Sequence, residues 1–305
     1  MKYITAKILL SLSFMFAAGQ TSAVLITPTD DANTLISNIL GTGITVLGSN
    51  YIDGANVSQS GTFTDGLASG LGFDAGIILT TGAASEASGP NISDGTTGIT
   101  GSGGDADLNL IVAPNSTFDS AVLEFDFQFG DGTAGGDLYF TFQFASEEYN
   151  EYTNSAFNDV FALYVDGVNV ALIPGTTTPV AINTVNGGNP LGTDASNPDL
   201  FNNNDPSDGG PFFNIEYDGF TDPFGAIALG LSTGAHTMKF AIADTSDQIL
   251  DSAVFIQAGS FSSEPPTQVT EPGALVLMGT GLLAIGLARR RRKKTGSVRA
   301  CSANT

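Results

Sequence analysis

Two acidic segments hold the side chains of this sequence that are best suited to chemistry. The first extends from Phe144 to Phe161 and the second from Asp244 to Ser252. Each follows a stretch with the alternating pattern of a β-strand, so both are expected in loops at sheet ends. Such loops can supply the roughly six to eight oxygen ligands that Ca²⁺ takes. The candidate calcium ligands are Glu147, Glu148, Asp159, Asp244, Asp247 and Asp251.

If the two segments converge in space, Glu147, Asp159, Asp244 and Asp251 could form a single site. The alternative is that these carboxylates are solvated or stabilise turns. The residues alone leave both readings open, and Ca²⁺ is the one cofactor that they suggest.

A third acidic stretch, Asp105 to Asn109, begins like an EF-hand loop. Leu110 occupies the position of the required turn glycine, and Ser116 occupies that of the bidentate glutamate. We therefore predict that this stretch is not an EF-hand.

Catalytic patterns are weak in this chain. His236 is the only histidine, and no Gly-x-Ser-x-Gly motif accompanies it. Glu147 and Glu148 are adjacent, so in a strand they would point to opposite faces, whereas a glycosidase needs two carboxylates that face one bond. We expect a non-enzymatic protein, with a hydrolase as the least favoured alternative.

The elements that must position these residues are mostly strands. Alternating patterns at Val122–Phe129 and Leu138–Phe144 predict a long hairpin, connected through Gly130–Gly136. A second hairpin is predicted around Asp166-Gly167. Further strands are predicted at Gly76–Gly82, Ala226–Leu231, His236–Ala243 and Ser252–Phe261. One helix is expected at Asp31–Leu40, with Thr29-Asp30 as its cap.

This pattern predicts an all-β fold, namely a β-sandwich that is jelly-roll-like, over residues 24–264. Two long polar loops are expected at Gly82–Gly104 and Gly187–Pro211. The only cysteine, Cys301, lies outside this region, so the domain has no disulfide.

The charge of the central part of the chain is strongly negative. Residues 24–270 contain 30 Asp and Glu, one lysine (Lys239) and no arginine, which gives a formal charge of −29. This composition excludes nucleic-acid binding, which needs a positive surface. Self-repulsion must be offset by salt or bound cations.

The N-terminus is typical of a secretory signal peptide. Lys2 and Lys7 precede an apolar stretch, and Thr21 and Ala23 lie at positions −3 and −1 of a cleavage site before Val24. Residues 1–23 are thus predicted to be removed after Ala23.

The C-terminus is a linker and a membrane-directed tail. A linker at residues 265–272 ends in Thr270, Glu271 and Pro272. The apolar segment 273–288 would span about 24 Å as a helix, slightly less than the roughly 30 Å of a bilayer core. The basic segment 289–305 begins with Arg289, Arg290, Arg291 and Arg292, which should remain cytoplasmic. A permanent anchor and a temporary one both fit.

This tail resembles the PEP-CTERM sorting signal of Gram-negative bacteria, although Thr270 replaces the first proline of the family motif. The resemblance implies an exosortase-like processing enzyme as partner. It also implies a membrane-anchored intermediate at the inner membrane and a final location at the cell surface or outside the cell.

A second resemblance covers most of residues 25–262. The segment Phe144–Tyr152, the Asn158–Phe161 segment and the Asp247–Ser260 region resemble the choice-of-anchor L domain, a group of bacterial surface domains. Together the resemblances imply an exported protein of the cell surface or extracellular matrix. The two targeting ends, the charge asymmetry and the missing catalytic pattern lead us to expect a role in adhesion or in matrix or biofilm structure.

The main alternative is a calcium-dependent module that binds an extracellular polysaccharide. Its support is the acidic loops together with three tyrosines expected to be exposed and able to stack on sugars: Tyr149, Tyr152 and Tyr217.

Overall fold

The computed structural model describes residues 22–54 and 57–266. The predicted sorting motif, apolar segment and basic tail lie outside the described residues, as does nearly all of the predicted signal peptide. Val24 is buried, and its N–H donates to the carbonyl oxygen of Asn214 at 3.3 Å. Val24, the residue that would follow the predicted cleavage, is thus packed against the domain. Within the described ranges, no helix is long and apolar enough to span a membrane.

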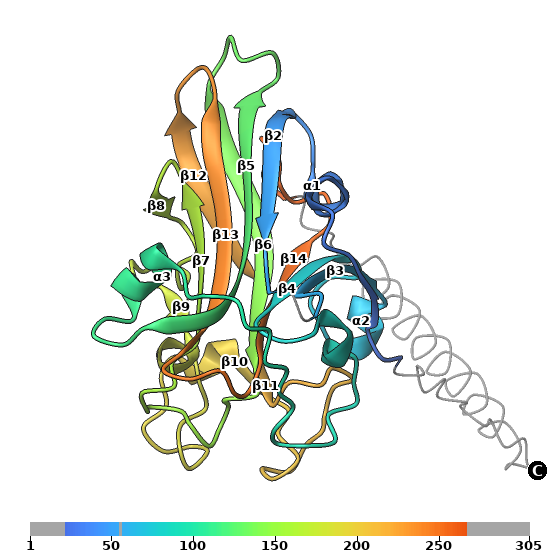
Figure 1. The fold of residues 1–305 in the computed structure, drawn as a ribbon, viewed down its shortest axis with the longest axis vertical. Coiled ribbons are helices and arrows are strands. Elements are labelled where there is room, and N and C mark those ends of the chain that lie inside the picture. Colours follow the sequence, from blue (N-terminus) through green and yellow to red (C-terminus); the bar gives the residue numbers. More distant parts are fainter. Residues whose placement is uncertain (1–21, 55–56, 267–305) are drawn as a thin grey trace, which may run out of the picture. The chain divides into compact units, whose positions relative to one another are not determined.

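Two antiparallel sheets face each other (Figure 1). The larger contains, in order, β1 (Leu25–Pro28), β3 (Ser60–Thr64), β4 (Gly76–Thr80), β14 (Ser252–Gln257), β6 (Gly136–Ser146), β11 (Gly219–Thr221) and β10 (Phe201–Asn203), and β12 (Phe224–Leu231) also pairs with β6. The smaller contains β2 (Ile44–Ile52), β5 (Thr117–Phe129), β13 (His236–Thr245), β7 (Val160–Val165) and β8 (Val168–Asn169), and β9 (Val180–Ala181) pairs with β7. The predicted β-sandwich is confirmed.

Helices are short: α1 (Ala32–Ile39), α2 (Gly66–Ser69), α3 (Ala106–Ile111) and the 3₁₀ turns η1 (Ala84–Ala87), η2 (Ile182–Thr184) and η3 (Pro198–Leu200). The predicted helix is present, but its cap is Asp31 rather than Thr29-Asp30. Asp31 Oδ2 accepts a hydrogen bond from the Thr34 N–H at 3.1 Å, as an N-cap carboxylate should.

The predicted long hairpin is wrong, because β5 and β6 belong to different sheets. Each of the two strands is apolar on one face. The two strands do not pair side by side in one sheet; their apolar faces point at each other across the sandwich. The hairpin predicted at Asp166-Gly167 is confirmed. Val165 pairs with Val168, and positive φ angles of 49° and 79° at the two turn residues match a type I′ turn.

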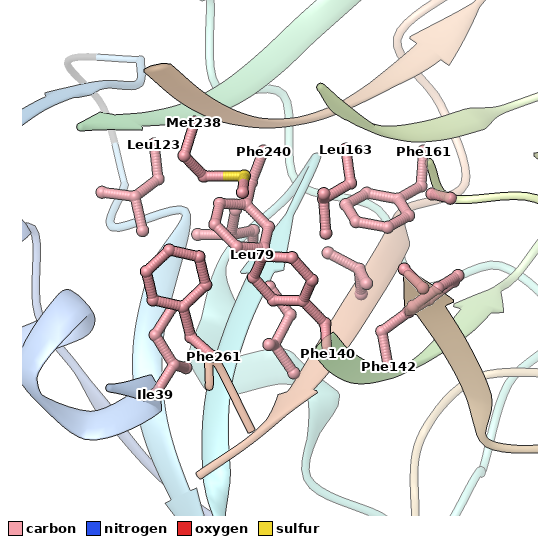
Figure 2. Close-up of a cluster of buried hydrophobic side chains, with 14 of the residues drawn as sticks. Ile39, Leu79, Leu123, Phe140, Phe142, Phe161, Leu163, Met238, Phe240 and Phe261 are labelled. Carbon is pink, nitrogen blue, oxygen red and sulfur yellow. The ribbon is translucent and has the colours of Figure 1, made fainter. Parts of the chain in front are cut away.

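Phenylalanine rings fill the space between the sheets (Figure 2). The ring of Phe140 lies 5.7 Å from that of Phe240 and 4.8 Å from that of Phe261, and all three are buried. Aromatic pairs at such distances stabilise a core beyond the area that they bury. This core holds the strands rigidly and so fixes where their end loops emerge.

Candidate metal centre

The two acidic segments predicted from the sequence meet at one end of the sandwich. Ser146, the last residue of β6, pairs with Ser252, the first residue of β14. Ala243 of β13 pairs with Val160, the first residue of β7. Long loops gather at this end, below β10 and β11 in Figure 1. We call it the loop end.

Asp159 joins the two segments from a fully buried position. Its Oδ1 accepts a hydrogen bond from the Thr245 N–H at 2.8 Å, and its Oδ2 accepts one from the Ser252 hydroxyl at 2.7 Å. Burial raises the pKa of Asp159 to about 7, although these two hydrogen bonds act in the opposite direction. Both carboxylate oxygens of Asp159 are therefore already hydrogen-bonded to protein donors.

Four other predicted ligands are buried with carboxylate oxygens that have no hydrogen-bond partner. Glu147 and Asp244 are each 1% exposed, and neither oxygen of either residue has a partner. Glu148 and Asp251 each have one such oxygen, Oε2 and Oδ2 respectively. Asp247, the sixth predicted ligand, is half-buried beside them. A buried carboxylate without a compensating partner is strongly destabilising, so these oxygens require one.

The pKa values of these groups show how unfavourable their negative charge is here. Burial, with added repulsion from Asp218, Glu216 and Asp251, raises the pKa of Glu147 to about 11. Burial, with repulsion from neighbouring acids, raises the pKa of Glu148 to about 10. A bound divalent cation would reverse this balance and favour the charged forms.

No basic side chain of the described residues relieves this negative charge. Their ion pairs involve only His236, which binds Asp166, and Lys239, which binds Asp105 and Asp107. Both lie away from the loop end. The segment 105–109 therefore has a structural role: Asp105 caps α3 and, with Asp107, binds Lys239 at 2.6 and 2.7 Å.

The six predicted residues do not gather around one point. Glu147 interacts with Asp218, Glu216 and Asp251, whereas Glu148 interacts with Asp159, Asp247 and Glu151. Asp244 interacts with both Asp159 and Asp251, so the six predicted ligands form an extended series of acidic groups and not one compact cluster.

Sequence reasoning missed several acidic residues that approach the loop end from other parts of the chain. They are Asp94, Asp119, Asp205, Glu216 and Asp218. Asp94 and Asp205 lie in the two long loops noted in the sequence, which was the only signal available. In the described chain, one trio of acidic residues brings a carboxylate oxygen from each within 4.8 Å of the others: Asp94, Glu151 and Asp205.

The tyrosines expected to stack on sugars are mostly unavailable. Tyr149 and Tyr217 are buried, and the hydroxyl of Tyr149 donates to the Val185 carbonyl at 2.8 Å. Only Tyr152, at 40% exposure, is open to solvent. The expectation of three exposed tyrosines is wrong for two of them, because their rings fill the packing around the loop end.

Two family models match the chain. The model of the choice-of-anchor L domain matches residues 25–262, and that of the PEP-CTERM protein-sorting motif matches residues 268–293. No curated protein and no solved structure matches this chain. The first match covers the β-sandwich and the second covers the predicted tail.

Proposed function

Since this chain belongs to the choice-of-anchor L domain family and carries a PEP-CTERM sorting motif, we propose that it is a non-enzymatic module for adhesion or matrix structure whose loop end binds Ca²⁺. The sorting motif implies export, a membrane-anchored intermediate and processing by an exosortase. The protein then resides at the cell surface or outside the cell.

The observation that carries the calcium proposal is the set of buried carboxylate oxygens without partners: two each from Glu147 and Asp244, and one each from Glu148 and Asp251. Glu147, Glu148 and Asp251 lie on loops and Asp244 lies near the end of β13. Such oxygen ligands at flexible spacing suit Ca²⁺ better than Mg²⁺, which demands near-octahedral geometry. Calcium would also reduce the self-repulsion of a domain with a formal charge of −29.

A thermal melt of the full chain in nonionic detergent tests this proposal. We expect Ca²⁺ to raise the melting temperature relative to a chelator, and Mg²⁺ to raise it less. Ligand at about 100 times its Kd adds about 2.7 kcal/mol to the free energy of unfolding.

Asp251→Asn should lose most of this calcium shift, because it removes one charge while its remaining oxygen can still accept the Gly98 N–H bond, 2.9 Å in the native domain. Asp199→Asn is a matched control, since Asp199 is exposed and lies outside the cluster. Identical melts with calcium and with chelator would refute the calcium assignment.

The proposed absence of catalysis is supported by the burial of the acidic residues and by the hydrogen bonds of His236. Glu147 and Asp244 are too buried to reach a substrate. Both ring nitrogens of His236 are engaged, Nδ1 with Asp166 at 2.7 Å and Nε2 with the Ser232 carbonyl at 3.0 Å. A hydroxyl nucleophile would need one of these nitrogens free.

A second candidate function, polysaccharide binding, is favoured by a groove on the outer face of the smaller sheet. The groove has a volume of about 500 Å³ and is lined by polar and aromatic side chains, including Asn50, Glu124, Tyr164 and Lys239. A glycan array of the full chain, with and without chelator, tests it. We expect any binding to decrease in Tyr164→Ala, and an array without signal in either condition would remove this candidate.

A further inference from the structure

We propose that the loop end contains a second divalent-cation site, formed by Asp94, Glu151 and Asp205, whose ion ties three separate loops together. None of these residues belongs to the predicted calcium set. The proposal is therefore independent of the calcium assignment above, and either can fail alone.

The geometry of the three carboxylates fits one shared ion. One oxygen from each lies within 4.8 Å of the other two. Ligands that contact a common Ca²⁺ at about 2.3–2.6 Å lie no more than about 5 Å apart. Asp94 comes from the loop between η1 and α3, Glu151 from the connection between β6 and β7, and Asp205 from the connection between β10 and β11. The site thus joins segments that are far apart in the sequence.

Two of the carboxylates are already held in place by the protein. Ser207 donates its backbone N–H to Asp205 Oδ1 at 2.6 Å and its hydroxyl to Asp94 Oδ2. One serine therefore aligns a ligand from each of two loops. Such preorganisation lowers the cost of assembling the site around an ion.

A buried amide oxygen beside the trio also has no partner. Asn150 is 2% exposed, and its amide nitrogen donates to Asp205 Oδ2 at 3.3 Å and to Asp208 Oδ2 at 3.0 Å. Its carbonyl oxygen, Oδ1, accepts no hydrogen bond. An amide oxygen is an ordinary calcium ligand, and rotation of the Asn150 amide would present Oδ1 in place of the nitrogen on the side of Asp205 and Asp208.

Asp218, which interacts with all three carboxylates of the trio, adds a second unpartnered oxygen. It is fully buried, and Asn91 donates to its Oδ1 at 2.6 Å, while Oδ2 has no partner. Burial raises the pKa of Asp218 to about 9, and the nearby charges of Asp205, Glu151 and Asp94 contribute to the increase. The negative charges of the trio and of Asp218 therefore repel one another, and no basic residue of the described chain lies among them.

The accessibility of the ligands predicts how this site should behave. Asp94 and Glu151 are exposed, whereas Asp205 is buried. Solvent reaches the ion from the side of the two exposed carboxylates, so it should exchange more readily than an ion beside Glu147 or Asp244. We expect the weaker of two classes of calcium binding in this domain.

Calcium titration calorimetry of the full chain in detergent tests the proposal with the double variant Asp94→Asn/Glu151→Gln. Both substituted residues are exposed, so the fold should be retained, and a melt in chelator verifies this. We expect the variant to lose one calcium ion per chain, or to bind it at least about tenfold more weakly, because affinity depends on the number of charged ligands. Asp199→Asn should leave the titration unchanged.

Hydrogen exchange provides a second readout. Calcium should protect backbone amides of residues 91–98 and 203–210 in the wild type, and this protection should be lost in the double variant. An unchanged stoichiometry and affinity in the double variant would overturn the second site. Asp251→Asn separates the two proposals, because it should lose most of the thermal shift described above and retain this weaker binding. A wild type that binds no calcium would overturn both.

Discussion

His236 shows how this acidic domain holds a positive charge. Nε2 lies beside the Ser232 carbonyl oxygen, which can only accept a hydrogen bond, so Nε2 must carry a hydrogen. Nδ1 lies 2.7 Å from the Asp166 carboxylate. Burial alone would lower the pKa of His236, but the hydrogen bonds to Asp166 and Ser232 outweigh it, and the pKa is raised above 6.5. The same pairing lowers the pKa of Asp166 against the effect of its burial.

The pair therefore stabilises the fold over a defined pH window. Because the folded pKa of His236 is raised, its contribution is complete below the unfolded value, about 6.5, and is lost as pH rises through the folded value. Because the folded pKa of Asp166 is lowered, its contribution is complete above the ordinary value of about 3.9 and is lost as pH falls through the folded one. The stabilisation should be greatest between these two ordinary values.

Asp166→Asn should lower the pKa of His236, because it removes the carboxylate charge that favours the imidazolium. Asparagine also tolerates the positive φ of 49° at this turn position, so the hairpin should persist. The chain has a single histidine, so proton NMR of the imidazole in untagged protein gives this pKa directly. Asp126→Asn is the control. It removes an exposed charge opposite Thr237 and should change the pKa of His236 little. Equal pKa values in wild type and Asp166→Asn would contradict this account.

At the scale of elements, local patterns predicted the strands but not all of their partners. The Asp166-Gly167 hairpin was predictable because two residues and their φ preferences determine it. The pairing of β5 with β6 was predicted wrongly because an alternating apolar face is equally suited to a neighbour in the same sheet or in the opposite one. The choice depends on the whole core, where Phe140 of β6 packs against Phe240 of β13.

The candidate site, too, could be predicted from the sequence only where strand pairing determines it. Asp159 directly precedes β7 and Asp244 lies near the end of β13, so the meeting of their segments follows from the pairing of these two strands. Asp94 and Asp205 lie in long loops whose paths depend on contacts such as those of Ser207 and Asn204, and no local pattern specifies these. Sequence could therefore indicate an acidic loop end, but not which carboxylates share an ion.

At the scale of the whole molecule, the distribution of charge separates the exported domain from its targeting segments. Between residues 8 and 288 the only basic side chain apart from His236 is Lys239, while the other lysines and arginines lie in the two terminal segments. The basic cluster thus lies next to the apolar segment, where the positive-inside rule favours a cytoplasmic location. The domain itself depends on salt or bound cations to offset its negative charge. Sorting and folding use separate parts of the sequence.

This separation predicts that the tail determines location without affecting the domain. Deletion of residues 270–294 should abolish the membrane-anchored intermediate, because it removes the motif, the apolar segment and the basic cluster together. Glu271→Ala with Pro272→Ala removes only the motif, so an unprocessed precursor should accumulate in the membrane fraction. Immunoblots of fractionated cells measure both, and a calcium melt of the deleted form should match that of the full chain. Wild-type fractionation of the motif variant would instead indicate a permanent anchor, since only a processing enzyme needs Glu271 and Pro272.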